Sequence, residues 1–189
     1  DKIDKHSKKI GAVNFVSKIN NKWVGKNTDW VGFLKTIKNS KKTIKNNKAI
    51  VFGYGGVSKA IIYALQKNGF KEINVYNRSE KKIKGLSLKK GIKKITLESA
   101  IKKMDTFDIA INTTPVNILK NNNKKYNIFA FDAVYKPKET SFLSHFPKNK
   151  RMYGVEMLVY QAEPCFREWF GAYPKTNKKL FNTLETKGS

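Results

Sequence analysis

A glycine cluster directly after an apolar run is the feature that most limits how this chain can fold. Residues 48–53 read KAIVFG, which predicts a buried strand, and residues 53–60 read GYGGVSKA. A dinucleotide-binding turn needs one glycine for the tight turn, a second for close approach of the pyrophosphate, and a small residue for helix packing. Gly53, Gly55, Gly56 and Ala60 meet these needs, with Ser58 at the usual third glycine. The stretch predicts a phosphate-binding turn; a turn without a ligand is the alternative.

Strands and helices alternate along the chain from residue 48. We expect strands over 48–53, 72–77, 93–97, 107–114 and 127–135, and helices over 56–68, 80–88 and 98–104. Parallel strands require such helical crossovers, so the pattern predicts an α/β fold with a doubly wound parallel sheet of the Rossmann type. Outside this region we expect short strands over 11–17 and 23–24, and helices over 29–37, 155–170 and 176–184.

The end of the second expected strand bears on the choice of nucleotide. Enzymes that bind NAD commonly place an acidic residue there, to accept hydrogen bonds from the ribose hydroxyls. This chain has Asn77, Arg78 and Ser79 instead, and Arg78 is one of only three arginines. A guanidinium can hold a 2′-phosphate through paired hydrogen bonds. The sequence therefore predicts NADP rather than NAD; the alternative for Arg78 is a solvated loop residue.

The formal net charge of +25 raises the question of a nucleic-acid partner. The basic residues are nearly all lysines, they are spread along the whole chain, and asparagine is abundant as well. This composition is typical of an AT-rich coding bias, and no zinc-finger or aromatic-basic RNA motif is present. We therefore interpret the charge as a solvated lysine coat, and nucleic acid as an unlikely partner. A non-catalytic nucleotide-binding or nucleic-acid-binding module is the alternative.

The number of cysteines and the length of the apolar runs bear on the cellular compartment and on membrane partners. The single cysteine, Cys165, allows no disulfide within the chain, which fits a reducing, cytoplasmic location. No apolar run approaches the length of a membrane span, so we expect no membrane partner. His6 and His145 have no partners at ligand spacing, so we expect no metal site and interpret both as surface residues.

Seven motifs occur in order: GAVN (11–14), NTD (27–29), GYGG (53–56), NRS (77–79), NTTP (112–115), DAVYKP (132–137) and GVEMLVYQA (154–162). Together they resemble the shikimate dehydrogenase family, over about residues 11–174. The resemblance implies reversible reduction of 3-dehydroshikimate to shikimate with NADPH, in the synthesis of aromatic amino acids. A paralogue that acts on quinate is the alternative enzyme. The oligomeric state stays open between monomer and homodimer.

The resemblance also implies roles for individual residues. Asn14 and Gln161 would bind hydroxyl groups of the substrate, Tyr135 would lie near its carboxylate, and Asp29 would bind it and pair with a catalytic lysine. From the residues alone, Asn14 could be a turn residue, Asp29 a helix cap and Gln161 a helix-surface residue. The implied cofactor contacts are Gly53, Gly55, Gly56, Asn77, Arg78, Ser79, Thr113, Gly154 and Met157.

Some of the family pattern has no match here. Phe15, Trp30 and residues 115–118 replace residues that are usual in the family. The family also has a serine pair and the catalytic lysine ahead of GAVN, and residues 1–10 match neither motif. We therefore expect these 189 residues to bind NADPH without turning over shikimate. The expected division is the end of a substrate domain over 1–28, an NADP-binding domain over 29–154, and C-terminal helices over 155–189.

Overall fold

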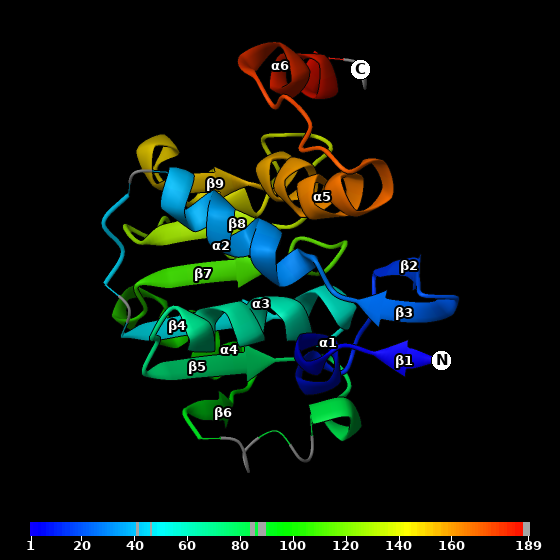
Figure 1. Ribbon diagram of the computed structural model, residues 1–189. Helices are drawn as coiled ribbons and strands as arrows, with labels where there is room; N and C mark the ends of the chain where they lie inside the picture. Colours follow the sequence, from blue (N-terminus) through cyan, green and yellow to red (C-terminus); the bar gives the residue numbers. More distant parts are fainter. Residues whose placement is uncertain (41, 46, 84–85, 87–89, 187–189) are drawn as a thin grey trace.

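A computed structural model of the chain describes residues 1–40, 42–45, 47–83, 86 and 90–186. Within these residues, six parallel strands form the main sheet, in the order β6-β5-β4-β7-β8-β9 (Figure 1). The strands are β4 (Lys48–Phe52), β5 (Glu72–Tyr76), β6 (Ile92–Lys94), β7 (Ile109–Asn112), β8 (Phe129–Asp132) and β9 (Arg151–Tyr153). The strand order reverses direction between β4 and β7, as in doubly wound dinucleotide-binding sheets. The predicted fold class is confirmed.

Alternating strand residues separate into two hydrophobic layers, because successive side chains point to opposite faces of a sheet. Ala49 and Val51 pack under α2 (Asp29–Asn39), α3 (Gly56–Lys67) and α5 (Gly154–Phe170). Ile50 and Phe52 pack on the other face. That face is covered by α4 (Leu97–Lys102), η3 (Met104–Thr106) and η4 (Leu143–His145). Strands buried on both faces explain the continuous apolar runs in the sequence.

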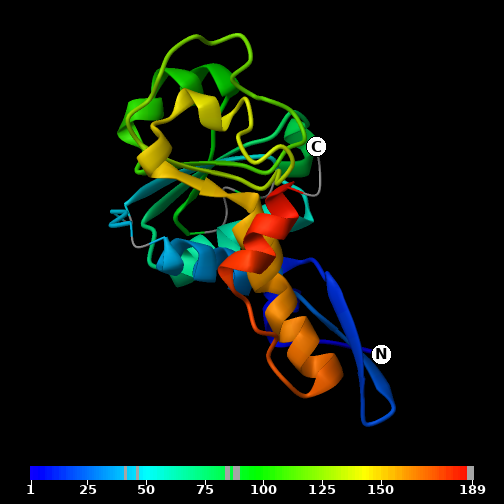
Figure 2. The same ribbon diagram turned by 90° about the horizontal axis from the view of Figure 1, so that it is seen from above.

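A smaller sheet lies beyond the carboxyl ends of the main strands (Figure 1). It contains β1 (Lys2–Ile3), β2 (Phe15–Ile19) and β3 (Lys22–Lys26), in the order β1-β3-β2, with α1 (Lys5–Ile10) between β1 and β2. Asn20 and Asn21 have φ of 47° and 62°, the left-handed pair that a tight hairpin requires. This hairpin and the outer end of α5 project together from the body of the molecule (Figure 2).

Several elements differ from the expectations. The sequence did not predict β1, α1 or β9, since these short elements lie outside the apolar runs of the chain. The 3₁₀ helix η5 (Lys148–Lys150), which precedes β9, was also not predicted. The expected helix over 80–88 begins as the 3₁₀ helix η1 (Glu80–Ile83), and residues 84, 85, 87 and 88 lie outside the described residues. The last helix, α6 (Lys178–Thr186), begins two residues later than expected.

Neither histidine lies simply on the surface, which corrects that interpretation. His145 is buried, and its Nδ1 lies 3.1 Å from the carbonyl oxygen of Lys124. His6 stacks on Trp30 and shares a 2.7 Å hydrogen bond with the hydroxyl of Tyr63, so it attaches α1 to α3. Short-range sequence context does not show these contacts, because each joins residues distant in the chain.

Candidate cofactor and substrate site

The glycine loop starts at Gly53, immediately after β4. Gly53 has φ of 107°, and its N–H donates to the carbonyl of Tyr76 at 2.8 Å. A Cβ at this position would lie 2.5 Å from Thr113 Oγ1, which is closer than atoms can approach. Both the dihedral angle and the space therefore require glycine, and the predicted tight turn is present here.

The start of α3 is open where a phosphate group would bind. Gly55 caps the helix, and a Cβ built on it would meet no atom within 4 Å. Gly55 and Gly56 are exposed, so the first amides of this 12-residue helix face solvent instead of a side chain. This end of the helix carries the positive end of its dipole. The geometry therefore fits the pyrophosphate of a dinucleotide.

Ser58 occupies the position where the dinucleotide-binding pattern usually has its third glycine, and its hydroxyl connects the loop to Thr113, directly after β7. The N–H of Gly55 donates to Ser58 Oγ at 3.1 Å, and Ser58 Oγ lies 2.6 Å from Thr113 Oγ1. Thr113 Oγ1 in turn donates to the carbonyl of Phe52 at 2.7 Å. Since each hydroxyl has one proton, Ser58 must donate to Thr113. The chain of bonds gives Thr113 a structural role; its predicted contact with the cofactor stays a prediction.

The residues that follow β5 lie at the mouth of a cavity of about 400 Å³. Asn77 and Arg78 both line it, and the Asn77 amide donates to the carbonyl of Ser79 at 2.8 Å. Arg78 is exposed and has no hydrogen-bond or ion-pair partner among the described residues. Glu80 contributes a carboxylate to the same wall. The guanidinium is therefore available to an anionic ligand.

Three residues that the family resemblance assigns to the substrate come together on the other side of the loop. Asn14 Nδ2 donates to Asp29 Oδ1 at 2.8 Å and approaches Gln161 Oε1 at 3.4 Å. Asn14 precedes β2, Asp29 lies in the first turn of α2, and Gln161 lies on α5. Asp29 does not cap the helix, because Thr28 occupies that position. We name Asn14, Thr28, Asp29 and Gln161 the polar cluster.

Thr28, which the sequence offered beside Asp29 as a possible helix cap, also organises this cluster, a role that was not predicted. Its backbone N–H donates to Asn14 Oδ1 at 2.8 Å, and its hydroxyl donates to Gln161 Oε1 at 3.1 Å. The Asn14 amide oxygen is thus held on Thr28, which leaves Nδ2 facing Asp29. Thr28 is 6% exposed, and its hydroxyl also lies 3.5 Å from Cys165 Sγ. The place of Thr28 inside the NTD motif (27–29) is the sequence feature that could have indicated this role.

A close contact between helices brings Gln161 to the cluster. A Cβ built on Gly32 would lie 2.7 Å from the Cβ of Gln161 and 2.8 Å from the carbonyl oxygen of Met157. Glycine at this position lets α2 and α5 approach until Gln161 meets Thr28. No motif marks Gly32 in the sequence, because its importance depends on a partner helix far along the chain.

Burial shapes the electrostatics of Asp29. Removal from water raises the pKa of its carboxyl group, and the hydrogen bond from Asn14 opposes this rise. Asp29 has no ion-pair partner within the part of the chain that the structure describes. A carboxyl group in this state holds its proton more readily than one in water, and it would favour a cation placed beside it.

The loops after β7 and β8 are joined beneath the site by Asp132. Its Oδ1 accepts from Asn112 Nδ2 at 3.1 Å, and its Oδ2 accepts from the hydroxyl of Thr140 at 2.7 Å. Burial raises the pKa of this carboxyl group. Tyr135 extends from the loop that Asp132 holds, and it is 44% exposed. Its predicted contact with substrate stays a prediction.

Gly154 and Met157 have packing roles in the structure. A Cβ on Gly154 would lie 2.6 Å from the carbonyl oxygen of Ala133, so α5 begins directly against the end of β8. Met157 is buried in the core between the sheet and the helices. Their predicted contacts with the nicotinamide are not tested by these observations.

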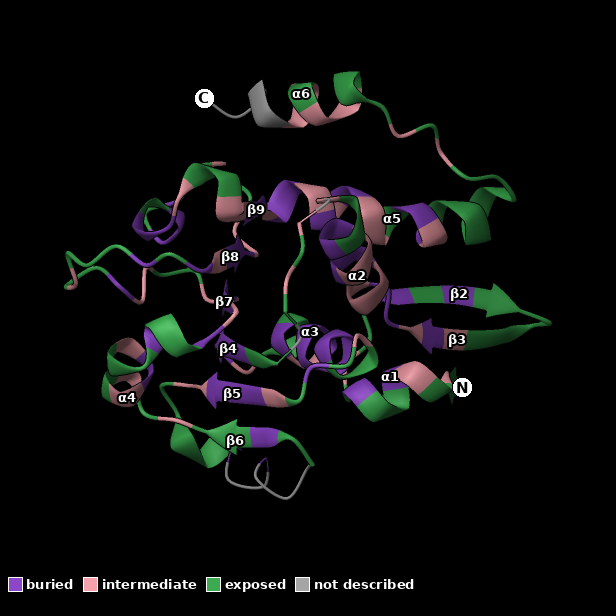
Figure 3. Cartoon of the chain, turned by 90° about the vertical axis from the view of Figure 1, so that its left-hand side faces the viewer, coloured by how far each residue is buried: buried purple, intermediate pink, exposed green. Residues whose placement is uncertain are grey.

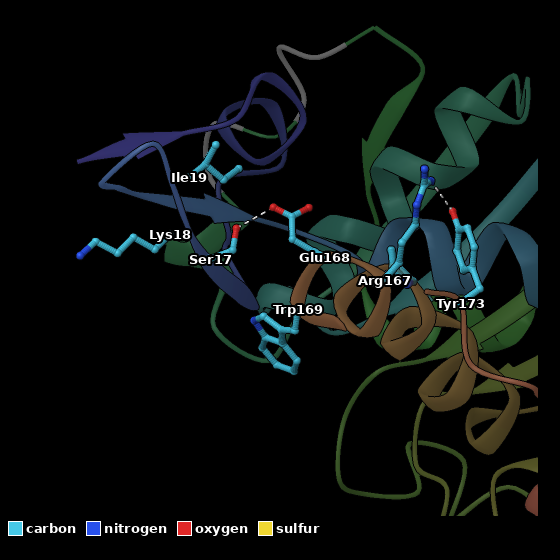
Figure 4. A pocket seen from close by; sticks show the side chains of 8 residues that line it. Ser17, Lys18, Ile19, Arg167, Glu168, Trp169 and Tyr173 are labelled. Atoms are coloured by element: carbon cyan, nitrogen blue, oxygen red, sulfur yellow. Dashed lines mark hydrogen bonds between the residues drawn. The ribbon is translucent and has the colours of Figure 1, made fainter. Parts of the chain in front are cut away.

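Further cavities lined by described residues adjoin α5. An apolar groove of about 550 Å³ borders Asn14, Gln161 and Cys165 and extends along the aromatic side chains at the outer end of α5. A separate cleft lies between β2 and that outer end (Figure 4). In it Ser17 donates to Glu168 at 2.7 Å, and Arg167 donates to the hydroxyl of Tyr173 at 2.8 Å. None of the predicted site residues lines this second cleft.

The described residues contain neither a cluster of metal ligands nor a membrane-spanning helix. No group of three or more His, Cys, Asp or Glu side chains within them is arranged to hold a metal ion. None of the helices in the described ranges combines the length and apolar character that crossing a membrane requires.

The chain matches known proteins over nearly its whole length. Residues 35–129 match a family model described as shikimate / quinate 5-dehydrogenase. The chain is 39% identical to the shikimate dehydrogenase (NADP(+)) of Dictyoglomus thermophilum over 183 residues, which cover 90% of this chain and 66% of that protein. The chain therefore spans about two thirds of the length of this relative.

Solved structures agree with this match. The shikimate dehydrogenase of Aquifex aeolicus superposes with a TM-score of 0.79 at 31% identity, over 98% of this chain and 69% of that one. The shikimate 5-dehydrogenase of Thermus thermophilus, solved with NADP(H) and shikimate, gives a TM-score of 0.76 at 28% identity, over 98% and 70%. From its sequence, its sheet order and these similarities, the chain belongs to the shikimate dehydrogenase family.

Proposed function

We propose that this chain provides the NADP-binding part and a portion of the substrate pocket of a shikimate dehydrogenase, which reversibly reduces 3-dehydroshikimate to shikimate. The arrangement of the polar cluster is the observation that carries the proposal. Asn14, Asp29 and Gln161 meet through hydrogen bonds. The small sheet that follows Asn14 lies beyond the carboxyl ends of the main strands, and the glycine loop follows the carboxyl end of β4 (Figure 1). Ligands of doubly wound sheets bind in this region.

Different residues would bind the cofactor and the substrate. NADP, when bound, supplies or accepts the hydride. Gly55 and Gly56 leave the first amides of α3 open to its pyrophosphate, and Arg78 is free to bind its 2′-phosphate. Asn14 and Gln161 carry amide groups that can exchange their mutual hydrogen bond for bonds to ring hydroxyls of the substrate.

Reduction of a ketone also needs a proton on the oxygen atom. Asp29 can stabilise a cationic proton donor, because a buried carboxylate gains from a neighbouring positive charge. No such cation pairs with Asp29 among the described residues. We propose that a lysine outside these 189 residues takes this place, so the chain alone binds NADPH without turning over shikimate. The division at residues 28/29 and 154/155 belongs to the same proposal.

Nucleotide affinity tests this function. Titration with NADPH and with NADH, followed by nucleotide fluorescence, should show preference for NADPH. Arg78→Met should weaken NADPH binding at least about tenfold and leave NADH unchanged. Arg167→Met removes the same charge at the far end of α5 and should change neither. Equal affinity for both nucleotides, unaffected by Arg78→Met, would rule out the NADP assignment.

Turnover by this chain is a separate test. Shikimate oxidation by the 189 residues above a control without protein would contradict the proposed absence of the proton donor. A quinate-specific enzyme is the second candidate, because the matching family model includes quinate dehydrogenases. Steady-state comparison of shikimate and quinate, on a protein extended to the full length of the relatives, separates the two.

A further inference from the structure

The cavity beside Arg78 contains a second cation that no sequence motif indicates. Lys94 is the last residue of β6, and its side chain lines the same cavity of about 400 Å³. Lys94 pairs in register with Val75 on β5, so it lies next to the end of the strand that leads to Arg78. Two neighbouring parallel strands thus bring both cations to one cavity at their carboxyl ends.

Lys94 differs from its neighbour Lys93 in having no partner within the described residues. Lys93 Nζ bonds to Glu72 Oε2 at 2.6 Å, and this ion pair accounts for its position. In the same part of the chain the Lys94 side chain has no hydrogen bond or ion pair, and the same holds for the Arg78 side chain. Glu80 is the one carboxylate among the described lining residues of the cavity, and no ion pair joins it to either cation. The charge in this cavity is therefore available to a ligand.

The shape and position of the cavity indicate the kind of anion. Tyr76, Ile95 and Leu97 supply half-buried apolar walls, which suit the face of a base or the edge of a ribose. The carbonyl of Tyr76 accepts the hydrogen bond from Gly53, so the cavity borders the glycine loop directly. A ligand with its pyrophosphate on α3 would extend across Gly53 into this space. An additional phosphate on its ribose would then enter the cavity that both cations line.

We propose that Lys94 is a specificity-determining residue, which binds the 2′-phosphate together with Arg78 and favours NADPH over NADH. This inference rests on the proposed function, since it concerns the same nucleotide. A phosphate monoester carries close to two negative charges at neutral pH, so a second cation adds attraction that the 2′-hydroxyl of NADH cannot gain. Both cations are exposed, which limits the expected effect through solvent screening.

Lys94→Met and Lys93→Met form a matched pair for the test. Each removes one positive charge from the same short strand, and only Lys94 lines the cavity. We expect Lys94→Met to weaken NADPH binding about five- to twentyfold with NADH affinity unchanged, whereas Lys93→Met alters neither by more than about twofold. Lys94→Arg should keep the preference. The thermal melt of Lys94→Met should coincide with that of the parent, because the side chain has no hydrogen bond or ion pair within the described residues to lose.

The outcomes separate this inference from the proposed function. If Lys94→Met leaves NADPH affinity unchanged, or lowers NADPH and NADH affinity equally, the role of Lys94 is refuted while an effect of Arg78→Met still supports the NADP assignment. If the parent chain binds NADPH no better than NADH, both proposals fail together. Selective loss of NADPH affinity in Lys94→Met, absent in Lys93→Met, supports the inference.

Discussion

The glycine loop and the polar cluster face the same side of the sheet, but the chain builds them in different ways. The loop lies within residues 53–58, and one distant residue, Thr113, fastens it. The polar cluster joins residues 14, 28, 29 and 161, which come from the small sheet, from α2 and from α5. The first is a local structure on a buried strand, and the second exists only once distant helices have packed.

The two regions also differ in what they leave open. In the loop the side chains are bonded to one another, and the backbone amides at the start of α3 remain exposed. In the cluster the amide side chains bond to each other, and an apolar groove continues from them along α5. Figure 3 shows that the central strands of the main sheet are buried, whereas the tip of the hairpin and the outer end of α5 are exposed. The glycine loop, which is the proposed cofactor region, therefore leaves backbone donors open, and the polar cluster, which is part of the proposed substrate region, adjoins an apolar surface.

Gly53→Ala should have the largest effect, because it should distort the glycine loop and so lower both stability and NADPH affinity. The new Cβ would overlap Thr113 Oγ1 at 2.5 Å, and φ of 107° is costly for alanine. We expect a loss of roughly 3 kcal/mol in the free energy of unfolding and more than about a tenfold loss of NADPH affinity. Urea unfolding and fluorescence titration measure the two quantities.

Gly55→Ala is the matched control for that change. Its Cβ meets no atom within 4 Å, so the stability cost should stay below about 0.5 kcal/mol. The methyl group would still occupy the space that a pyrophosphate needs, so NADPH affinity should fall. Unchanged NADPH binding in Gly55→Ala would show that the open end of α3 does not hold the nucleotide.

Thr28→Val should disturb the substrate region with a smaller cost. The variant keeps the shape of the side chain and loses the hydroxyl that bonds to Gln161. We expect a loss of about 1 kcal/mol in stability, together with shifts in the side-chain amide NMR signals of Asn14 and Gln161.

Thr36→Val provides the comparison on the same helix. Thr36 is fully buried, and its hydroxyl donates to the carbonyl of Gly32 within α2. Its loss should cost a similar amount and leave the two amide signals in place. Amide signals that do not move in Thr28→Val, or that move equally in both variants, would contradict the organising role of Thr28.

The same contrast explains how much the sequence could predict. The glycine loop and five of the six strands of the main sheet were predicted because their signals are local: apolar runs, glycines and the residues that follow each strand. β9 was missed because Arg151–Tyr153 lies outside any alternating or apolar run, whereas the equally short β6 leads into Ile95 and Leu97. Ser58 could be recognised as a departure from the glycine pattern, but its bonds to Gly55 and Thr113 could not.

The polar cluster could be predicted only through the family resemblance. No periodicity connects Asn14 with Gln161, which lie 147 residues apart. Thr28 and Gly32 were missed for the same reason, since each acts through a partner on α5. The sequence does not distinguish Lys94 from the other basic residues, because Lys and Arg together number 39. Its relation to Arg78 depends on strand register and on the cavity that both residues line.

The smallest predicted effect concerns the proton on Asp29. Burial raises its pKa above the ordinary 3.8, and the hydrogen bond from Asn14 limits the rise. Asn14→Leu keeps the bulk of the side chain and removes this bond, so the pKa of Asp29 should rise further. Gln161→Met should not raise it, because Gln161 makes no hydrogen bond to Asp29. Titration of the Asp29 carboxyl carbon by NMR measures both.

The direction of the stability change follows from the raised pKa. The folded chain binds the Asp29 proton more tightly than the unfolded chain, so this group stabilises the fold below pH 3.8 and loses that contribution as the pH rises through the folded-state value. Asn14→Leu should extend the loss to higher pH, and urea unfolding across this range should show it. A pKa of Asp29 that stays constant or falls in Asn14→Leu would mean that Asn14 does not control the carboxyl group.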